Sequence, residues 1–271
     1  MTLPDLPTIL DPEALEPLLG AEGLLVVDLC KPDVYARLHV PGAVFLDYGR
    51  IVAARSPVAG LMPDPAALEA VLSGIGIGDD THVIAYDDEG GGKAGRLLWT
   101  LDVLGHRRSS LLNGGLHAWA NEGRPLEARP AVARPAQFTA RPDPAPSADA
   151  DYVLDRLADP ELCLLDARSA EEYSGAKRLA ARGGHIPGAV HWDWLEALDR
   201  DRNLRLRPEV ELRAELEGRG VTADRIVVTY CQTHHRSSLS YMVLKSLGYP
   251  RIKGYPGSWS DWGNRPDTPV E

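Results

Sequence analysis

The stretch that decides the fold is Ile226-Val227-Val228-Thr229-Tyr230-Cys231-Gln232-Thr233-His234-His235-Arg236-Ser237-Ser238-Leu239. Its first five residues are β-branched or apolar without alternation, which is typical of a central strand covered on both faces. Helical periodicity begins near Ser237 and continues to Gly248, a residue type that commonly ends helices. The pattern predicts a buried strand, a short loop and a helix. Ligands of parallel sheets bind outside the carboxyl ends of the strands, so the loop that begins at Cys231 is the expected functional position.

The first half of the chain carries a second copy of this pattern. Val83-Ile84-Ala85-Tyr86 form the apolar run there, and Asp87 follows where the later copy has cysteine. His39-Val40-Pro41-Gly42-Ala43 likewise corresponds to His185-Ile186-Pro187-Gly188-Ala189. Repetition over half the chain indicates two modules of one α/β fold, each a mostly parallel sheet flanked by helices.

A proline-rich segment separates the two copies. Residues 124–150 contain Pro125, Pro130, Pro135, Pro142, Pro144 and Pro146. So many prolines exclude a helix or a central strand and predict an extended surface linker. The expected organisation is a first domain at 1–124, a linker at 125–146 and a second domain at 147–271.

Composition excludes several classes of protein. Of the 271 residues, 44% are hydrophobic and 25% are charged, as in soluble globular proteins with a real core. The formal net charge of −10 argues against nucleic acid or an anionic membrane surface as a bulk partner. The first ten residues include no basic residue, unlike a secretory signal peptide, so we expect a cytoplasmic protein. We also expect a monomer.

The three cysteines must be judged one by one, because their number and spacing fit neither a disulfide framework nor a zinc site. Cys163 lies inside the apolar run Leu162-Cys163-Leu164-Leu165, which favours a core position. Cys30 follows a strand end without a basic loop and is expected to be inert. Cys231 remains as the candidate nucleophile. The alternative, a small buried hydrophobe, fits poorly with the polar residues that follow it.

A short loop between a strand and a helix can turn successive backbone N–H groups inward and so bind an anion. Such a loop would lower the pKa of Cys231 and favour its thiolate. Arg236 adds positive charge, although a solvated surface arginine is the alternative. The two histidines could add charge or only line the loop, and a histidine pair alone is not a metal site. The residues expected to bind an anionic substrate are Gln232, Thr233, His234, His235 and Arg236.

These motifs resemble the tandem-domain rhodaneses, or thiosulfate sulfurtransferases, over nearly the whole chain, and in particular those of the Azotobacter type. Residues 35–43 match the family's N-terminal signature. Residues 255–262 match its C-terminal signature, with Asp261 where the family usually has glutamate. The six residues from Cys231 to Arg236 match its active loop.

The resemblance implies two rhodanese modules, the first catalytically silent, and a ping-pong reaction. In that reaction Cys231 would take sulfur from an anionic donor such as thiosulfate and pass it from a persulfide to cyanide, a thiol or a protein acceptor. The resemblance implies no metal or organic cofactor. Arg236 would bind the donor, and Ser237 would support the loop. Asp166 and Arg168 would lie near the site, where a salt bridge that organises the strand end is an equally good interpretation.

The loop differs from those of animal thiosulfate and 3-mercaptopyruvate enzymes, so donor preference does not follow from the resemblance. The animal enzymes also have arginine where this chain has Glu172.

Other functions stay open: a sulfur or selenium relay loaded by a cysteine desulfurase, a 3-mercaptopyruvate sulfurtransferase, and a purely structural repeat. A phosphatase or arsenate reductase needs Cys-x5-Arg, one residue more than Cys231 to Arg236. Residues 90–93 lack the spacing of a phosphate-binding loop.

Overall fold

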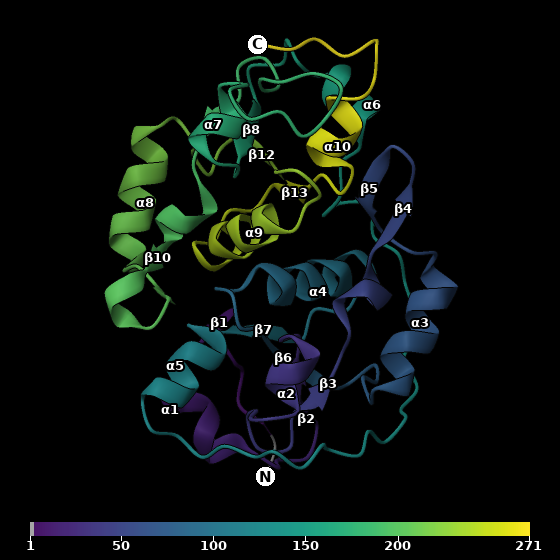
Figure 1. Cartoon of the computed structure of the whole chain (residues 1–271), viewed down its shortest axis with the longest axis vertical. Helices are drawn as coiled ribbons and strands as arrows, with labels where there is room; N and C mark the ends of the chain where they lie inside the picture. The colour runs from purple at the N-terminus through teal and green to yellow at the C-terminus, as the bar shows by residue number, and fades with distance from the viewer. Residues whose placement is uncertain (1–2) are drawn as a thin grey trace. The chain divides into compact units, whose positions relative to one another are not determined.

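The computed structural model describes residues 3–271 and divides into two compact units (Figure 1). The first unit contains the described residues up to Ile51 together with Pro63–Asp143 and Leu198–Leu206. The second contains Val52–Met62, Pro144–Ala197 and Arg207–Glu271. Each unit therefore includes a short segment from the other half of the chain.

The first unit is built on a five-stranded, wholly parallel sheet in the order β1-β7-β6-β2-β3. The strands are β1 (Ile9–Leu10), β2 (Leu24–Asp28), β3 (Val44–Phe45), β6 (His82–Tyr86) and β7 (Ser109–Leu112). The helices and 3-10 turns are α1 (Pro12–Leu15), η1 (Glu16–Leu18), α2 (Pro32–Tyr35), η2 (Tyr48–Ile51), α3 (Pro65–Gly74), α4 (Gly92–Val103) and α5 (Gly115–Asn121). Every residue of β6 is buried, as the apolar run before Asp87 predicts. The long helix α4 packs on β6 and β7 (Figure 1).

The second unit repeats this plan with a four-stranded parallel sheet in the order β13-β12-β8-β9. The strands are β8 (Leu162–Asp166), β9 (Val190–His191), β12 (Ile226–Tyr230) and β13 (Ile252–Gly254). The helices and 3-10 turns are α6 (Ala150–Leu154), α7 (Ala170–Tyr173), η3 (Trp194–Ala197), α8 (Glu209–Gly218), α9 (Arg236–Ser246) and α10 (Ser258–Trp262). The predicted α/β class, with mostly parallel sheets flanked by helices, is confirmed.

Two antiparallel hairpins each lie in one half of the chain but belong to the unit that the other half forms. The hairpin β4 (Ala53–Arg55) and β5 (Val58–Leu61) belongs to the second unit, where β5 packs against α10. The hairpin β10 (Leu198–Asp199) and β11 (Arg205–Leu206), joined by η4 (Arg200–Arg202), belongs to the first unit.

The motif His-x-Pro-Gly-Ala has an architectural part in both units. Tyr35 stacks on His39 and donates its hydroxyl hydrogen to the carbonyl oxygen of Ala43. Tyr173 stacks on His185 and makes the corresponding bond with the carbonyl oxygen of Ala189. The glycine of each motif has φ +73°, a conformation that glycine adopts at little cost. The repeated motif therefore secures the turn that leads into β3 and β9.

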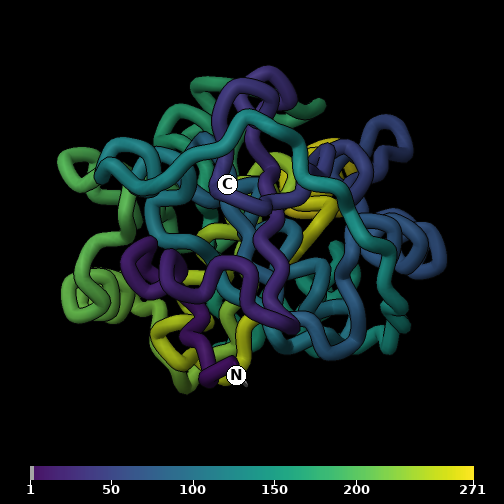
Figure 2. Tube along the Cα trace, turned by 90° about the horizontal axis from the view of Figure 1, so that it is seen from below, coloured from purple at the N-terminus to yellow at the C-terminus, as the bar shows by residue number. Residues whose placement is uncertain are grey.

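The proline-rich segment is extended and contains no helix, as Figure 2 shows. It is nevertheless bound to the first unit as far as Asp143. Phe138 is 2% exposed, and the backbone N–H groups of Arg141 and Asp143 donate to the carbonyl oxygens of Leu104 and Val103.

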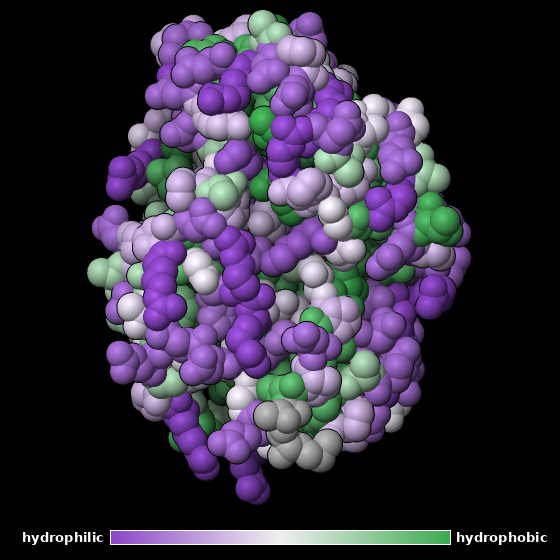
Figure 3. All heavy atoms as spheres, turned by 180° about the vertical axis from the view of Figure 1, so that it is seen from behind, coloured by the Kyte–Doolittle hydropathy of each residue, from purple (hydrophilic) through white to green (hydrophobic). Residues whose placement is uncertain are grey.

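The face seen in Figure 3 is mostly hydrophilic, with apolar side chains scattered over it. Among residues 3–271, no helix is both long and apolar enough to cross a membrane.

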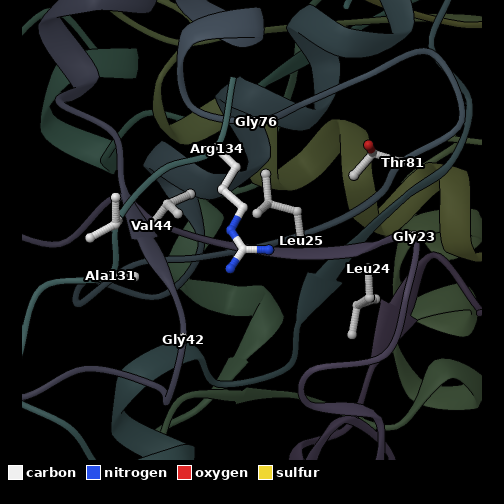
Figure 4. A pocket seen from close by; sticks show the side chains of 10 residues that line it. Gly23, Leu24, Leu25, Gly42, Val44, Gly76, Thr81, Ala131 and Arg134 are labelled. Carbon is white, nitrogen blue, oxygen red and sulfur yellow. The ribbon is translucent and has the colours of Figure 1, made fainter. Parts of the chain in front are cut away.

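A cavity of about 260 Å³ in the first unit is shown in Figure 4. Gly23 and Leu24, at the amino end of β2, help to line it, whereas Asp87 follows the carboxyl end of the neighbouring β6. This cavity therefore lies at the opposite end of the sheet from the loop that Asp87 begins.

Candidate active site

The loop that begins at Cys231 lies between a buried strand and a buried helix. The strand β12 ends at Tyr230, and α9 begins at Arg236, so Cys231 to His235 form the whole connection. Residues 237–244 of α9 are all buried. The loop therefore stands on two rigid elements at the carboxyl end of a central strand, which is the position the sequence predicts.

Residues of the turn between β13 and α10, and of the start of α10, form hydrogen bonds with the backbone of this loop. The Ser258 hydroxyl oxygen accepts the N–H of Cys231 at 3.2 Å and that of His234 at 3.0 Å, and its hydrogen goes to the Tyr255 carbonyl oxygen at 2.7 Å. The N–H groups of Trp259 and Ser260 bind the carbonyl oxygens of Cys231 and Gln232 at 2.9 and 3.0 Å. These bonds hold several peptide groups of the loop in place.

Cys231 is buried, with 1% of its surface exposed, and its polar neighbours favour the thiolate. Burial raises the pKa of the thiol, but three influences outweigh it and lower the pKa below its usual value. These are the charge of Arg236, a hydrogen bond from the Ser237 hydroxyl, and bonds from the N–H groups of Ser237 and Thr233. Both N–H groups come from the loop and the start of α9, as expected of an anion-binding loop. A thiolate in such a setting can act as a nucleophile.

Arg236 is held by a carboxylate rather than left open to solvent. Its Nη1 lies 2.6 Å from Glu172 Oε2, and its Nη2 lies 2.8 Å from Glu172 Oε1. The Glu172 side chain is 3% exposed and that of Arg236 is 20% exposed. This two-pronged pair orients the guanidinium beside Cys231.

The remaining residues of the loop lie at different depths. Gln232 and Thr233 are half-buried, and the Gln232 side-chain amide donates to the Leu179 carbonyl oxygen at 3.2 Å. A Cβ atom on Gly60 of β5 would lie 2.3 Å from the carbonyl oxygen of Thr233. The hairpin β4–β5 therefore closes tightly on the loop at this point.

The two histidines differ from each other. His235 is half-buried, and its ring centroid lies 6.3 Å from that of Trp194. His234 is fully buried with φ +51°, and its Nδ1 lies 2.8 Å from Ser237 Oγ. Because the Ser237 hydroxyl donates to Cys231, its oxygen accepts from His234 Nδ1, which assigns the tautomer. The structure thus places His234 against Ser237, and a direct contact of His234 with substrate stays a prediction.

Asp166 and Arg168 form a buried ion pair at the end of β8. Arg168 Nε lies 2.9 and 3.0 Å from the two carboxylate oxygens, and Nη2 also donates to the Gly184 carbonyl oxygen at 2.8 Å. The two side chains are 1% and 0% exposed. The pair therefore organises the strand end, and a direct contribution to donor binding stays a prediction.

In the corresponding loop of the first unit, the side chain of Asp87 binds the loop's own backbone N–H groups. Asp87 Oδ1 accepts the N–H groups of Glu89, Gly90 and Gly91 at 2.8–3.1 Å, and Oδ2 accepts that of Ala94 at 2.9 Å. The side chain thus occupies the space that a bound anion would take.

The other two cysteines, Cys30 and Cys163, are buried, and burial raises the pKa of both thiols. Within residues 3–271, no group of three His, Cys, Asp or Glu side chains could hold a metal ion.

The sequence did not identify Ser258 or Gly60 as parts of the site. Ser258 was visible only as a member of a motif, and its hydroxyl contacts depend on a turn 27 residues after Cys231. Glu172 stood out as a departure from the animal enzymes, but its partner Arg236 is 64 residues away. Such pairings require the fold.

Comparison with known proteins identifies the family. The model of the rhodanese-like domain matches twice, at residues 11–122 and 149–265. The chain belongs to the rhodanese family. The two matches correspond to the two halves of the repeat, so the two-module rhodanese fold is confirmed.

Two curated members of the family resemble the chain over nearly its whole length. The thiosulfate sulfurtransferase of Azotobacter vinelandii is 48% identical, covering 98% of this chain and 97% of that protein. The thiosulfate sulfurtransferase of Pseudomonas aeruginosa is 47% identical and covers 98% of both chains. A solved structure of EanB in complex with ergothioneine has a TM-score of 0.87 at 23% identity, over 97% of this chain and 70% of that one. The last likeness concerns the fold alone.

Proposed function

We propose that this rhodanese is a thiosulfate sulfurtransferase that works through a persulfide on Cys231. The Cys231 thiolate attacks the outer sulfur of thiosulfate, a new S–S bond forms, and the bond to the sulfonate sulfur breaks. Sulfite leaves with the bonding electron pair. Cyanide or a thiolate then attacks the terminal sulfur of the persulfide, which releases thiocyanate or a new persulfide and restores the thiolate.

The observation that carries this proposal is the set of donors around one sulfur atom. The charge of Arg236, the Ser237 hydroxyl and the N–H groups of Ser237 and Thr233 all lower the pKa of Cys231. The same donors can stabilise the terminal anionic sulfur of a persulfide, because they belong to a fixed loop that needs no reorganisation. The two thiosulfate sulfurtransferases that are nearly half identical to the chain support the choice of donor.

Loop size supports sulfur transfer over phosphoryl or arsenate chemistry. Four residues separate Cys231 from Arg236, and α9 begins at the arginine itself. The catalytic loop of Cys-x5-Arg enzymes is one residue longer and surrounds a tetrahedral oxyanion.

Initial-rate kinetics test the proposal. With thiosulfate and cyanide both varied, a persulfide intermediate predicts parallel lines in double-reciprocal plots, and Cys231→Ala should abolish turnover. Intersecting lines, or activity that survives in Cys231→Ala, would contradict the mechanism. A protein that turns over small donors negligibly, but is loaded by a cysteine desulfurase and cysteine, would be a sulfur relay instead. Faster turnover of 3-mercaptopyruvate than of thiosulfate would make it a 3-mercaptopyruvate sulfurtransferase.

A further inference from the structure

We propose that Glu172 acts as a resident anion that occupies the guanidinium of Arg236 and thereby sets the affinity of the site for anionic sulfur donors. The inference rests on the proposed function of Cys231 and concerns how its donor is selected. Glu172 is thus a specificity-determining residue that acts through Arg236.

The position of Glu172 is fixed before any donor binds. It lies in α7, whose first turn is capped by Ser169, and the Ser169 hydroxyl oxygen accepts the N–H of Glu172 at 3.4 Å. Both carboxylate oxygens lie within 2.8 Å of the two terminal nitrogens of Arg236. Since the Glu172 side chain is 3% exposed, water competes little for this pair.

Arg236 binds Glu172 through its two terminal nitrogens. These are the same atoms with which an arginine binds an anion in bidentate geometry. A sulfonate group presented to those nitrogens must displace the carboxylate or accept a poorer geometry. The pKa of Glu172 supports this competition. Burial raises this pKa, but the hydrogen bonds and charge of Arg236 outweigh burial and lower it overall, so Glu172 is an anion at neutral pH.

Other acidic groups act on the same guanidinium. Cys231 and Asp166 both interact electrostatically with Arg236, and so does Asp193 of the segment before η3. Asp166 is already bound by Arg168, and burial raises the pKa of Asp193. Glu172 is therefore the anion whose removal should most increase the positive charge available to a donor.

The variant Glu172→Gln keeps the size of the side chain and removes its charge. We expect the KM for thiosulfate to fall by about three- to tenfold, because the guanidinium of Arg236 then keeps more of its positive charge for the anionic donor. We also expect the pKa of the Cys231 thiol to fall. The pH profile of Cys231 alkylation by iodoacetamide, located by peptide mass, measures the second effect without any sulfur donor.

Glu171→Gln is the matched control. It removes the same charge from the neighbouring position of the same helix, where the side chain is exposed. We expect its KM and alkylation profile to equal those of the wild type. Glu172→Asp, which keeps the charge but shortens the reach, should give an intermediate fall in KM and covers the case that Glu172→Gln does not fold.

The outcomes separate the two proposals. A KM that rises in Glu172→Gln, or variants at 172 that behave like Glu171→Gln, would overturn the role of Glu172 while leaving the persulfide mechanism intact. Failure of the wild type to transfer sulfur from thiosulfate would defeat the proposed function. The alkylation profiles would then still decide whether Glu172 restrains the charge of Arg236.

Discussion

Ser258 shows how one buried hydroxyl can hold a catalytic loop. It is fully buried, has φ +50°, and joins three peptide groups: the N–H groups of Cys231 and His234, and the Tyr255 carbonyl. A buried N–H that loses its acceptor costs about 1–3 kcal/mol. We therefore expect Ser258 to stabilise the second unit and to fix the course of the loop on both sides of Thr233, whose N–H group bonds the sulfur.

Ser258→Ala should leave two buried N–H groups without their acceptor, lower the free energy of unfolding by about 2 kcal/mol and reduce kcat. Urea unfolding and steady-state rates measure the two effects. Ser240→Ala is the control, because the Ser240 Oγ on α9 is buried with no hydrogen-bond partner among the described residues. If both variants lose stability and activity equally, Ser258 has no special relation to the loop.

The sequence indicated the candidate reactive residues more readily than the residues that hold them in place. Cys231 and Arg236 could be identified because a strand, a loop and a helix N-terminus follow one another directly along the chain. Ser258 and Glu172 could not be assigned their partners, since these contacts span 27 and 64 residues. His234 was predicted either to add charge for a substrate or only to line the loop; its left-handed backbone and full burial could not be read from the sequence, and its contact with substrate stays a prediction.

The hairpin β4–β5 is the element that connects the first half of the chain with the catalytic loop. The N–H of Ala59 donates to Ser260 Oγ at 3.1 Å, and that hydroxyl donates to the Ala59 carbonyl oxygen at 2.9 Å. Gly60 then passes directly over Thr233. A segment that precedes the loop by about 170 residues thus limits how far the loop can move.

Gly60→Ala should displace the loop, because its Cβ would lie 2.3 Å from the Thr233 carbonyl oxygen. We expect kcat/KM for thiosulfate to fall at least tenfold, which corresponds to about 1.4 kcal/mol. Gly188→Ala is the control: Gly188 has φ +73°, close to the +75° of Gly60, but a Cβ there meets nothing within 4 Å. Similar activity in the two variants would mean that backbone strain alone explains the loss.

Strands and helices were predictable because periodicity is local. The apolar runs before Asp87 and Cys231 are β6 and β12, and the helix predicted near Ser237 is α9. The placement of the two hairpins was not predictable. Their sequences carry no signal that residues 52–62 pack with the second unit and residues 198–206 with the first.

Arg205 anchors the second of these hairpins within the first unit. Its side chain is 9% exposed and lies 2.7–2.9 Å from carboxylate oxygens of Asp11, Glu13 and Glu122. Hydrogen bonds from Arg205 lower the pKa of Glu13 and Glu122. Because the folded state then binds protons less readily than the unfolded chain, this stabilisation is present at neutral pH and lost as the pH falls through the lowered pKa values.

Arg205→Met should therefore lower the free energy of unfolding by about 2 kcal/mol at pH 7, and by much less near pH 2.5, which is well below the usual pKa of a glutamate at about 4.3. Urea midpoints at the two pH values measure the difference. Arg251→Met, which removes an exposed pair with Glu161, should change stability by about 0.5 kcal/mol or less at either pH. A loss in Arg205→Met that does not depend on pH would show that packing, rather than charge, holds the hairpin.

Taken as a whole molecule, the two modules share one scaffold but differ in what occupies their loops. In the first, the Asp87 carboxylate takes the loop N–H groups, which explains why we expect that module to be silent. In the second module, the N–H groups of Thr233 and Ser237 bond the Cys231 sulfur instead. We therefore expect one residue at the end of a central strand, Asp87 or Cys231, to distinguish the silent loop from the reactive one.

The most direct test of this account is the intact mass of the protein after incubation with thiosulfate and removal of excess donor. The wild type should gain the mass of one sulfur atom, and cyanide should remove it. Cys231→Ala should gain nothing, while Cys163→Ala, which removes a buried thiol of β8, should behave like the wild type. Sulfur that still appears on Cys231→Ala, or a wild type that gains none, would contradict a persulfide on Cys231.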